Sequence, residues 1–346
     1  MKRYIIKNVD EKFYNAASKA RRDADKIARE CGYEPIPFSD VVTANHSHLM
    51  QISMALSCLV NGIKMLFQVE RNSIVLLQYP QFPIKASYFL RVLIPVAKRM
   101  KGMRFVSLIH DLDSLRGLCG RTGIYCDRKV LPLMDVIICH NEAMKRYLVK
   151  KGIPNEKLIV LGVFDYLTEA VGKEHNQTEG ITIAGNLDPE KSGYIDGIKG
   201  VIVHLYGNGR ETFPDSAVYH GAYPPEDLPG VIEGGFGLVW DGNKTDCCDG
   251  AAGKYLRIND PHKLSLYLAS GMPVIVWKKA AVARLVEDNG LGFAVENLED
   301  AGKVLADMRE DDYRQMAGNV KALSDKIRTG VYFKTALEKV EELLHY

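Results

Sequence analysis

Two patterns of apolar and polar positions alternate along this chain, one typical of buried strands and one of amphipathic helices. Continuous apolar runs predict strands of a parallel sheet, because helices cover both faces of such a sheet. Apolar residues at steps of three or four predict helices. In the first half we expect strands over residues 4–6, 73–80, 104–109, 135–139 and 157–162. We expect helices over residues 11–31, 46–68, 86–100 and 141–151.

The alternation restarts after a polar stretch without apolar period, residues 167–180, which we interpret as a linker. The strands expected beyond it cover residues 181–186, 201–207, 235–240 and 273–277. The helices expected there cover residues 261–270, 280–289, 299–308, 312–328 and 333–345. This succession predicts an α/β protein with two doubly wound, Rossmann-like domains. We place the domains at residues 1–166 and 167–330, with a C-terminal helix at 331–346.

Composition and charge narrow the function classes. With 346 residues, 47% of them hydrophobic and 25% charged, the chain has enough apolar material for two cores and is not largely disordered. A net charge of only +2 argues against a nucleic-acid binder. There is no apolar run of membrane-spanning length, no signal peptide and, among seven cysteines, no CxxC pair that would indicate zinc. We therefore expect a cytoplasmic protein.

His110 and Asp111 directly follow the apolar run 104–109. Ligands of doubly wound sheets bind beyond the carboxyl ends of the strands, so both side chains are candidates for a site. A carboxylate in that position can act as a general base. The alternative is that Asp111 or Asp113 caps a helix.

A second candidate site begins where a glycine-rich loop leads into the helix expected from Pro261. The chain has no GxGxxG after its first strand and no Walker A loop, which argues against a standard NAD enzyme or P-loop NTPase. The free N–H groups of a helix start favour an anion, and we expect Asn259 or Asp260 to cap this helix. Lys263 in the first turn opposes the helix dipole, which suits a bound phosphate. A lysine that points into solvent is the alternative.

A third candidate is the turn after the strand expected at 181–186. Gly185 permits close backbone approach, and Lys191 can reach a phosphate oxygen. A plain strand-to-helix turn is the alternative.

Residues 234–242 and 255–293 resemble a bacterial family of GT-B glycosyltransferases, and the agreement is most specific at 261–276. The family contains β-1,6-galactofuranosyltransferases of surface-polysaccharide assembly and glucosyltransferases that act on glycosylated adhesins. The resemblance covers essentially the whole chain. It implies two facing Rossmann-like domains, an N-terminal acceptor domain and a C-terminal UDP-sugar domain. It also implies that the C-terminal helix packs back on the first domain.

The resemblance implies a set of UDP-sugar-binding residues in the second domain. Lys263 and the helix start at His262 would hold the pyrophosphate, and Glu287 would hold the ribose. The other members would contact uridine or phosphate from turns after strands (Asn186, Lys191, Tyr206) or lie near the diphosphate or the sugar (Tyr255, Asn259).

One departure bears on the stereochemistry. Many retaining GT-B enzymes carry two glutamates eight residues apart, and the matching positions here are Ile258 and Leu266. UDP-galactofuranose is an α-linked donor, so a β-linked product requires inversion and a base on the acceptor hydroxyl. Asp111 is the candidate base, and His110 would orient it or contact the sugar. The DxD pattern at 111–113 belongs to a class with a different, single-domain organisation, so we expect neither a metal nor another cofactor.

The expected function is therefore transfer of galactofuranose, with inversion and a β-1,6-type linkage, from a UDP-sugar to a saccharide acceptor in surface-glycan assembly. The alternatives are a glucosyltransferase that uses UDP-glucose on a glycan or glycoprotein, a nucleotide-sugar epimerase and a non-catalytic glycan-binding protein. A lipid-linked acceptor would bring the protein to the inner face of the cell membrane, where the basic run 98–104 could contact anionic lipid. The sequence leaves a homo-oligomer open.

Overall fold

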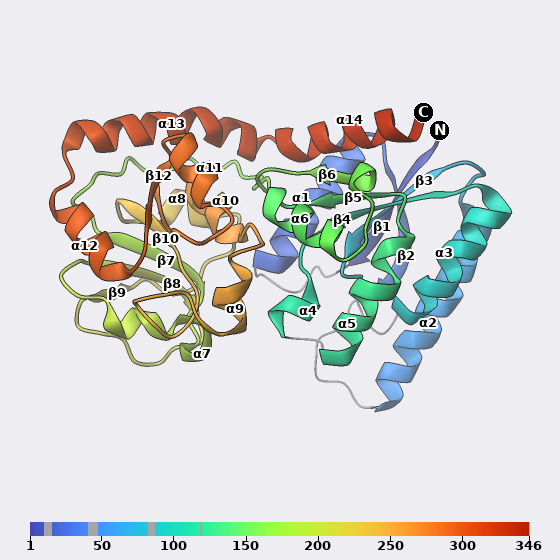
Figure 1. Ribbon diagram of the computed structural model, residues 1–346, viewed down its shortest axis with the longest axis horizontal. Helices are drawn as coiled ribbons and strands as arrows, with labels where there is room; N and C mark the ends of the chain where they lie inside the picture. The colour runs from blue at the N-terminus through green and yellow to red at the C-terminus, as the bar shows by residue number, and fades with distance from the viewer. Residues whose placement is uncertain (10–15, 41–47, 82–86, 118–119, 346) are drawn as a thin grey trace. The chain divides into compact units, whose positions relative to one another are not determined.

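The computed structural model describes residues 1–9, 16–40, 48–81, 87–117 and 120–345 (Figure 1). The chain forms two compact units, each built around its own sheet. The first unit contains Met1–Phe13, Arg21–Gly162 and Phe333–Tyr346, and the second contains Tyr14–Ala20 and Val163–Tyr332. The predicted α/β class with two parallel sheets is confirmed.

The first unit has a six-stranded parallel sheet in the order β2-β1-β3-β4-β5-β6. Its strands are β1 (Arg3–Val9), β2 (Glu34–Asp40), β3 (Ile74–Tyr79), β4 (Arg104–Ile109), β5 (Val136–Cys139) and β6 (Leu158–Val160). Apolar continuity predicted all of them except β2, in which Pro35 and Pro37 interrupt the apolar pattern. An edge strand tolerates proline, because one of its sides needs no ladder hydrogen bonds.

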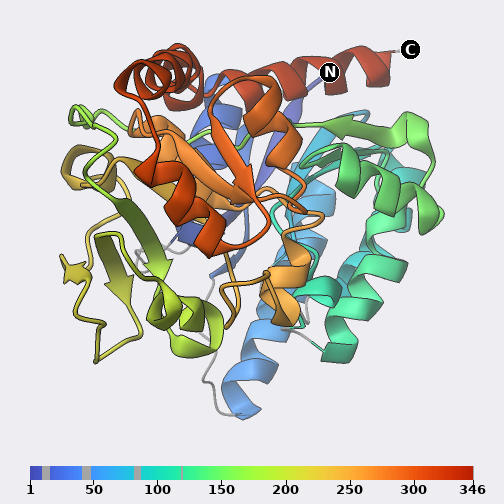
Figure 2. The same ribbon diagram turned by 60° about the vertical axis from the view of Figure 1, so that its left-hand side comes forward.

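Helices surround this sheet, and the C-terminal helix belongs to the same unit. They are α1 (Ala16–Glu30), α2 (His48–Gln68), α3 (Ser87–Lys101), α4 (Asp113–Arg116), α5 (Gly120–Lys129), α6 (Glu142–Lys150) and α14 (Val331–His345). Helices α2 and α3 run side by side in both views (Figures 1 and 2). The expected return of the C-terminal helix is confirmed: Glu341 forms an ion pair with Arg3 of β1, and Lys334 pairs with Glu30 of α1 at 2.9 Å.

The second unit repeats the architecture with the strand order β12-β11-β10-β7-β8-β9. Its strands are β7 (Ile181–Asn186), β8 (Val203–Asn208), β9 (Ala217–Tyr219), β10 (Phe236–Val239), β11 (Val274–Trp277) and β12 (Gly292–Val295). Its helices are α7 (Pro189–Ser192), α8 (Leu228–Val231), α9 (Gly250–Tyr255), α10 (His262–Ala269), α11 (Ala283–Asp288), α12 (Leu298–Ala306) and α13 (Glu310–Arg328). Residues 167–180 contain no helix or strand, as the polar stretch predicted.

Close packing in the second unit holds α10 against its sheet. Tyr267 of α10 is fully buried, and its hydroxyl accepts the N–H of Ala184 in β7 at 2.9 Å. A Cβ on Gly237 in β10 would lie 2.1 Å from the Tyr267 ring, so this strand position requires glycine. The contact fixes the helix whose first turn contains Lys263. Among the described helices, none combines the length and the apolar character that a membrane span needs.

Candidate active site

In the first unit, a hydrogen-bonded chain joins the ends of β3 and β4. Nε2 of the buried His110 lies 2.8 Å from Oε1 of Gln78, and the Gln78 amide nitrogen donates to the carbonyl of Arg21 at 3.2 Å. Because a carbonyl only accepts, the amide nitrogen faces Arg21 and the amide oxygen faces His110. Nε2 of His110 therefore carries the hydrogen, so the tautomer and the orientation of the ring are both defined.

Arg21 of α1 forms two hydrogen bonds with the end of β3. Its guanidinium donates to the carbonyls of Gln78 at 3.0 Å and Pro80 at 2.8 Å. Burial lowers the pKa of Arg21 to about 10, against the opposing effect of the carboxylates of Asp111 and Asp113. The end of β3 is thus held by a cation whose charge these two acids balance.

Asp111 follows β4 and pairs with Arg116, whose Nη1 lies 2.5 Å from its Oδ2. The Asp111 side chain is 24% exposed, so it combines a defined position with access to solvent. Asp111 caps no helix: α4 begins at Asp113, and Leu112 precedes it without a side-chain cap. The capping alternative is therefore wrong for Asp111, and its carboxylate is held by the guanidinium of Arg116.

His140, which sequence reasoning missed, lies at the end of the neighbouring strand β5. Its Nε2 lies 3.0 Å from the carbonyl oxygen of Ile109, the residue before His110. The ring is fully buried, and burial lowers the pKa of His140 to about 3. The only signal for it in the sequence is its position directly after the apolar run that ends at Cys139.

In the second unit, Lys263 is anchored at the start of α10. Its Nζ lies 2.9 Å from the carbonyl oxygen of Trp240 and 2.9 Å from Oδ1 of Asp241. Both charged side chains are largely buried, 15% and 10% exposed respectively. An ammonium has three donors, and these contacts use two of them. No third partner is found among the described residues, which leaves one donor for an anion.

The helix starts at His262, as predicted, but the expected cap is wrong. The residue that precedes the first turn is Pro261, with ψ 137° and no side-chain cap, so neither Asn259 nor Asp260 caps α10. The proline occupies the extended cap position itself and not the first helical position, and its side chain offers no acceptor to the first N–H groups of the helix. Asn259 is buried, and its Oδ1 has no hydrogen-bond partner in the described chain.

The turns after β7 and β10 meet at the carboxyl edge of this sheet. The N–H of Gly242 donates to the carbonyl of Lys191 at 2.8 Å, which links α7 to the residue after Asp241. Asn186 is exposed at the end of β7, and its Oδ1 accepts the N–H of Asp188 at 2.9 Å. The structure therefore brings the segments of Lys191 and Lys263 together through the loop at 240–242. Asp241 was not among the residues predicted from the sequence.

Two of the predicted residues, Tyr206 and Tyr255, are buried in the second unit. Tyr206 was expected on a turn, and that placement is wrong: it lies inside β8, fully buried, and its hydroxyl accepts the N–H of Glu233 at 2.9 Å. The strand extends through Gly207 to Asn208, so the turn begins later than the apolar run indicated. Tyr255 is buried at the end of α9.

The side chains of His262 and Glu287 lie in different surroundings: the ring nitrogens of His262 are buried, whereas Glu287 is exposed. The His262 ring packs on Tyr166, with centroids 5.1 Å apart, and burial lowers its pKa to about 3. Only its backbone N–H remains suited to an anion. Glu287 is exposed in α11, and in the described part of the chain no hydrogen bond or ion pair joins its side chain to the other predicted residues.

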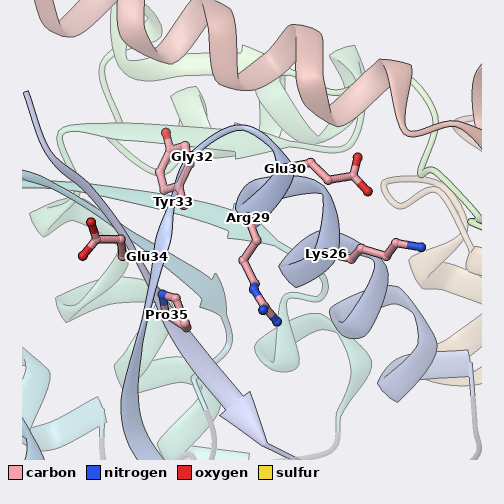
Figure 3. Close-up of a pocket in the computed structure, with 7 residues that line it drawn as sticks. All are labelled: Lys26, Arg29, Glu30, Gly32, Tyr33, Glu34 and Pro35. Carbon is pink, nitrogen blue, oxygen red and sulfur yellow. The ribbon is translucent and has the colours of Figure 1, made fainter.

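An open groove of about 720 Å³ lies elsewhere in the first unit (Figure 3). Its lining comes from the end of α1 and the start of β2: Lys26, Arg29, Glu30, Gly32, Tyr33, Glu34 and Pro35. None of the predicted site residues contributes to it, so the groove is separate from the strand-end cluster around His110 and Asp111.

Two family models match nearly the whole chain. The model described as "Glucosyltransferase 3-like, N-terminal domain" matches residues 2–163, and "Glucosyltransferase 3-like, C-terminal domain" matches residues 181–340. The boundary between them falls at the polar stretch 167–180.

Known proteins resemble the chain over nearly its full length. The β-1,6-galactofuranosyltransferase WbbI of Escherichia coli (strain K12) is 33% identical, with 97% of this chain and 98% of that protein covered. Glucosyltransferase 3 of Streptococcus gordonii is 24% identical, with 94% of each chain covered. The crystal structure of HepE from Anabaena in complex with UDP and glucose superposes with a TM-score of 0.61, at 12% identity and 99% coverage of each chain. This last likeness shows a shared fold.

Proposed function

This chain belongs to the glucosyltransferase 3-like family of GT-B glycosyltransferases, and on that premise we propose that it transfers galactofuranose from UDP-galactofuranose to a saccharide hydroxyl with inversion, forming a β-1,6-type linkage. Nucleotide-sugar-dependent glycosyl transfer is the activity common to its relatives, which favours it over epimerisation or mere glycan binding. One observation carries the choice of sugar: the 33% identity over 97% of the chain to a galactofuranosyltransferase.

The position of Asp111 supports the inverting chemistry. In the proposed step the Asp111 carboxylate takes the proton of the acceptor hydroxyl while that oxygen bonds to the anomeric carbon of the donor sugar. The bond from this carbon to the β-phosphate oxygen of UDP breaks on the opposite face, and the electron pair leaves with UDP. Arg116 keeps the carboxylate in place, and His110 is held by Gln78 beside it. The proton on Asp111 then passes to water.

Departure of UDP needs positive potential at the diphosphate. The first N–H groups of α10 lack a side-chain cap, and the macrodipole of this eight-residue helix favours an anion at its start. Lys263 would add a full charge there, with its remaining donor directed to a phosphate oxygen. Asp241 positions the ammonium, because it holds Nζ at 2.9 Å.

UDP-glucose is the second candidate donor. It is favoured by the 24% identity to glucosyltransferase 3 over 94% of the chain. A choice between two hexoses depends on a few pocket contacts, each worth about 1–3 kcal/mol. We include metal-independent transfer and a lipid-linked acceptor at the inner membrane face as further parts of the proposal.

The test is a competition assay with equal concentrations of UDP-galactofuranose and UDP-glucose, run with the wild type and Asp111→Asn. We expect the galactofuranosyl product to dominate. Loss of the base should lower kcat by roughly 10²–10⁴-fold while UDP affinity stays unchanged. Glu156→Gln, an exposed acid of the same unit, is the matched control and should keep wild-type turnover.

Each part of the proposal has its own contradicting result. A dominant glucosyl product would show that UDP-glucose is the preferred donor. Near-normal turnover of Asp111→Asn would show that Asp111 is not the catalytic base. A product with the configuration of the donor would contradict inversion.

A further inference from the structure

Two histidines and a glutamate converge in the second unit beside the buried Tyr206. His204 lies in β8, His220 directly follows β9, and Glu233 lies between α8 and β10. Nδ1 of His204 is 3.0 Å from Nε2 of His220, and Oε2 of Glu233 is 3.9 Å from the first nitrogen and 4.0 Å from the second. Three potential ligand atoms thus lie within 4.8 Å of one another.

These separations match a metal site. Zn²⁺ binds histidine nitrogen and carboxylate oxygen at about 2.0–2.2 Å in a tetrahedron, so neighbouring ligand atoms lie about 3.4 Å apart. The three observed separations fall on both sides of that value. Small rotations of the side chains would therefore bring all three atoms to bonding distance.

Two of the atoms that do not face the cluster, one on His204 and one on Glu233, are already engaged. Nε2 of His204 lies 3.0 Å from the carbonyl oxygen of Glu179, which only accepts, so this nitrogen carries the hydrogen and Nδ1 presents its lone pair to the cluster. The other carboxylate oxygen of Glu233 accepts from Lys173 at 3.1 Å. Such outer partners orient ligands in known metal sites.

Tyr206 positions the remaining ligand. Its ring stacks on His220 with centroids 4.5 Å apart and an angle of 2° between the planes. Its hydroxyl accepts the N–H of Glu233 at 2.9 Å. One buried side chain therefore contacts two of the three cluster residues.

We propose that Nδ1 of His204, Nε2 of His220 and Oε2 of Glu233 bind one Zn²⁺ ion, with water as the fourth ligand. The Glu233 side chain is 46% exposed, which gives an ion access to the site. Glu179 and Glu233 precede β7 and β10, so the cluster lies toward the amino edge of the sheet, opposite the edge of Lys263. The ion would tie β8 to the segments next to β9 and β10 and would take no part in glycosyl transfer.

The competing arrangement is a metal-free histidine pair, in which Nε2–H of His220 donates to Nδ1 of His204. Zinc binding would move that hydrogen to the other ring nitrogen of His220, because a ligating nitrogen must be bare. The Lys173 ammonium favours the ionised form of Glu233 and opposes a cation. Direct metal binding therefore decides between the two arrangements.

The experiment uses the full chain, freed of metal with a chelator and without an affinity tag. Zn²⁺ titration by calorimetry and Co²⁺ titration by visible absorption should each give one site, the latter with tetrahedral d–d bands. His220→Gln and Glu233→Gln should each weaken binding at least about tenfold. Glu211→Gln, an exposed acid of the same unit, should bind as the wild type does.

Thermal unfolding without metal shows whether each variant is folded, so weaker binding is not confused with misfolding. Should His220→Gln not fold, Glu233→Gln decides alone, since its amide still can accept from Lys173. Absence of a site in the wild type, or equal affinity in the wild type and the folded variants, would overturn the proposal. Neither the metal titrations nor thermal unfolding depends on glycosyl transfer, so this test is independent of the proposed function.

Discussion

At the scale of single residues, the environment decides what a histidine does. His140 is fully buried against a backbone carbonyl and stays neutral, whereas His204 and His220 are partly exposed and face a carboxylate. His110 differs again, because Gln78 fixes which of its nitrogens carries the hydrogen. All are single histidines in the sequence, and their chemical roles differ because their partners differ.

Burial of His140 makes the free energy of unfolding depend on pH. Its pKa is lowered from 6.5 to about 3, so between these values the unfolded chain binds the proton and the folded chain does not. Stability is therefore complete above pH 6.5 and is lost as the pH falls towards 3. We expect this residue to cost about 2 kcal/mol between pH 7 and pH 5.

Urea unfolding of the wild type and His140→Gln, followed by circular dichroism at both pH values, measures this loss. The variant is neutral throughout and keeps a side-chain donor, so its pH-dependent loss should be smaller by that amount even if it is less stable at pH 7. Equal losses in the two proteins would show that other groups cause the pH dependence.

At the scale of elements, the contact between β10 and α10 positions the predicted diphosphate site. Gly237 lets the Tyr267 ring lie against the strand, and this places the first turn of α10 beside the 240–242 loop. The sequence predicted both elements. It did not predict their close approach, because glycine in a strand has several explanations until its neighbour is known.

Gly237→Ala should destabilise the protein by about 1–3 kcal/mol, because the new Cβ would lie 2.1 Å from the Tyr267 ring in a packed core. Chemical unfolding measures the change. Gly302→Ala in α12 is the matched control: nothing lies within 4 Å of its new Cβ, so it should stabilise the protein by about 0.5–1 kcal/mol. Two changes of the same sign would contradict the packing argument.

In the basic run at 98–104, the positions of α3 and β4 bring two cations to an acidic side chain. Its first residues belong to α3, which continues to Lys101, and Lys98 pairs with Asp135 at 2.8 Å. Arg104 lies 3.5 Å from the same carboxylate group. Two of these cations therefore share one carboxylate inside the unit, which reduces what the run can offer to an anionic membrane.

At the scale of the whole molecule, the two tryptophans offer a selective probe. Trp240 and Trp277 are the only tryptophans of the chain, and both lie buried in the second unit. The carbonyl of Trp240 accepts from Lys263. Tryptophan fluorescence therefore follows unfolding of the unit that we propose binds UDP, while circular dichroism follows both units.

UDP at a hundred times its Kd should stabilise the second unit by about 2.7 kcal/mol and raise its fluorescence-detected Tm. If Lys263→Met weakens UDP binding tenfold, the stabilisation at the same UDP concentration falls by about 1.4 kcal/mol. Each protein is compared with and without UDP, so the intrinsic effect of freeing Asp241 cancels. Lys199→Met, an exposed lysine of the same unit, should respond as the wild type does. If Lys263→Met is stabilised by UDP as much as the wild type is, Lys263 does not contribute to UDP binding.

The sequence by itself determined the class of fold, most of the strands and the strand-end position of Asp111. These features are local, because an apolar run or a helical period is complete within one segment. Tertiary structure decided which polar groups pair. Lys263 meets Asp241, and His204 meets His220 and Glu233, across separations for which the chain carries no periodic signal. Tyr206 shows the same limit: it was expected on a turn after a strand, and only the packed sheet placed it inside β8 against a histidine ring.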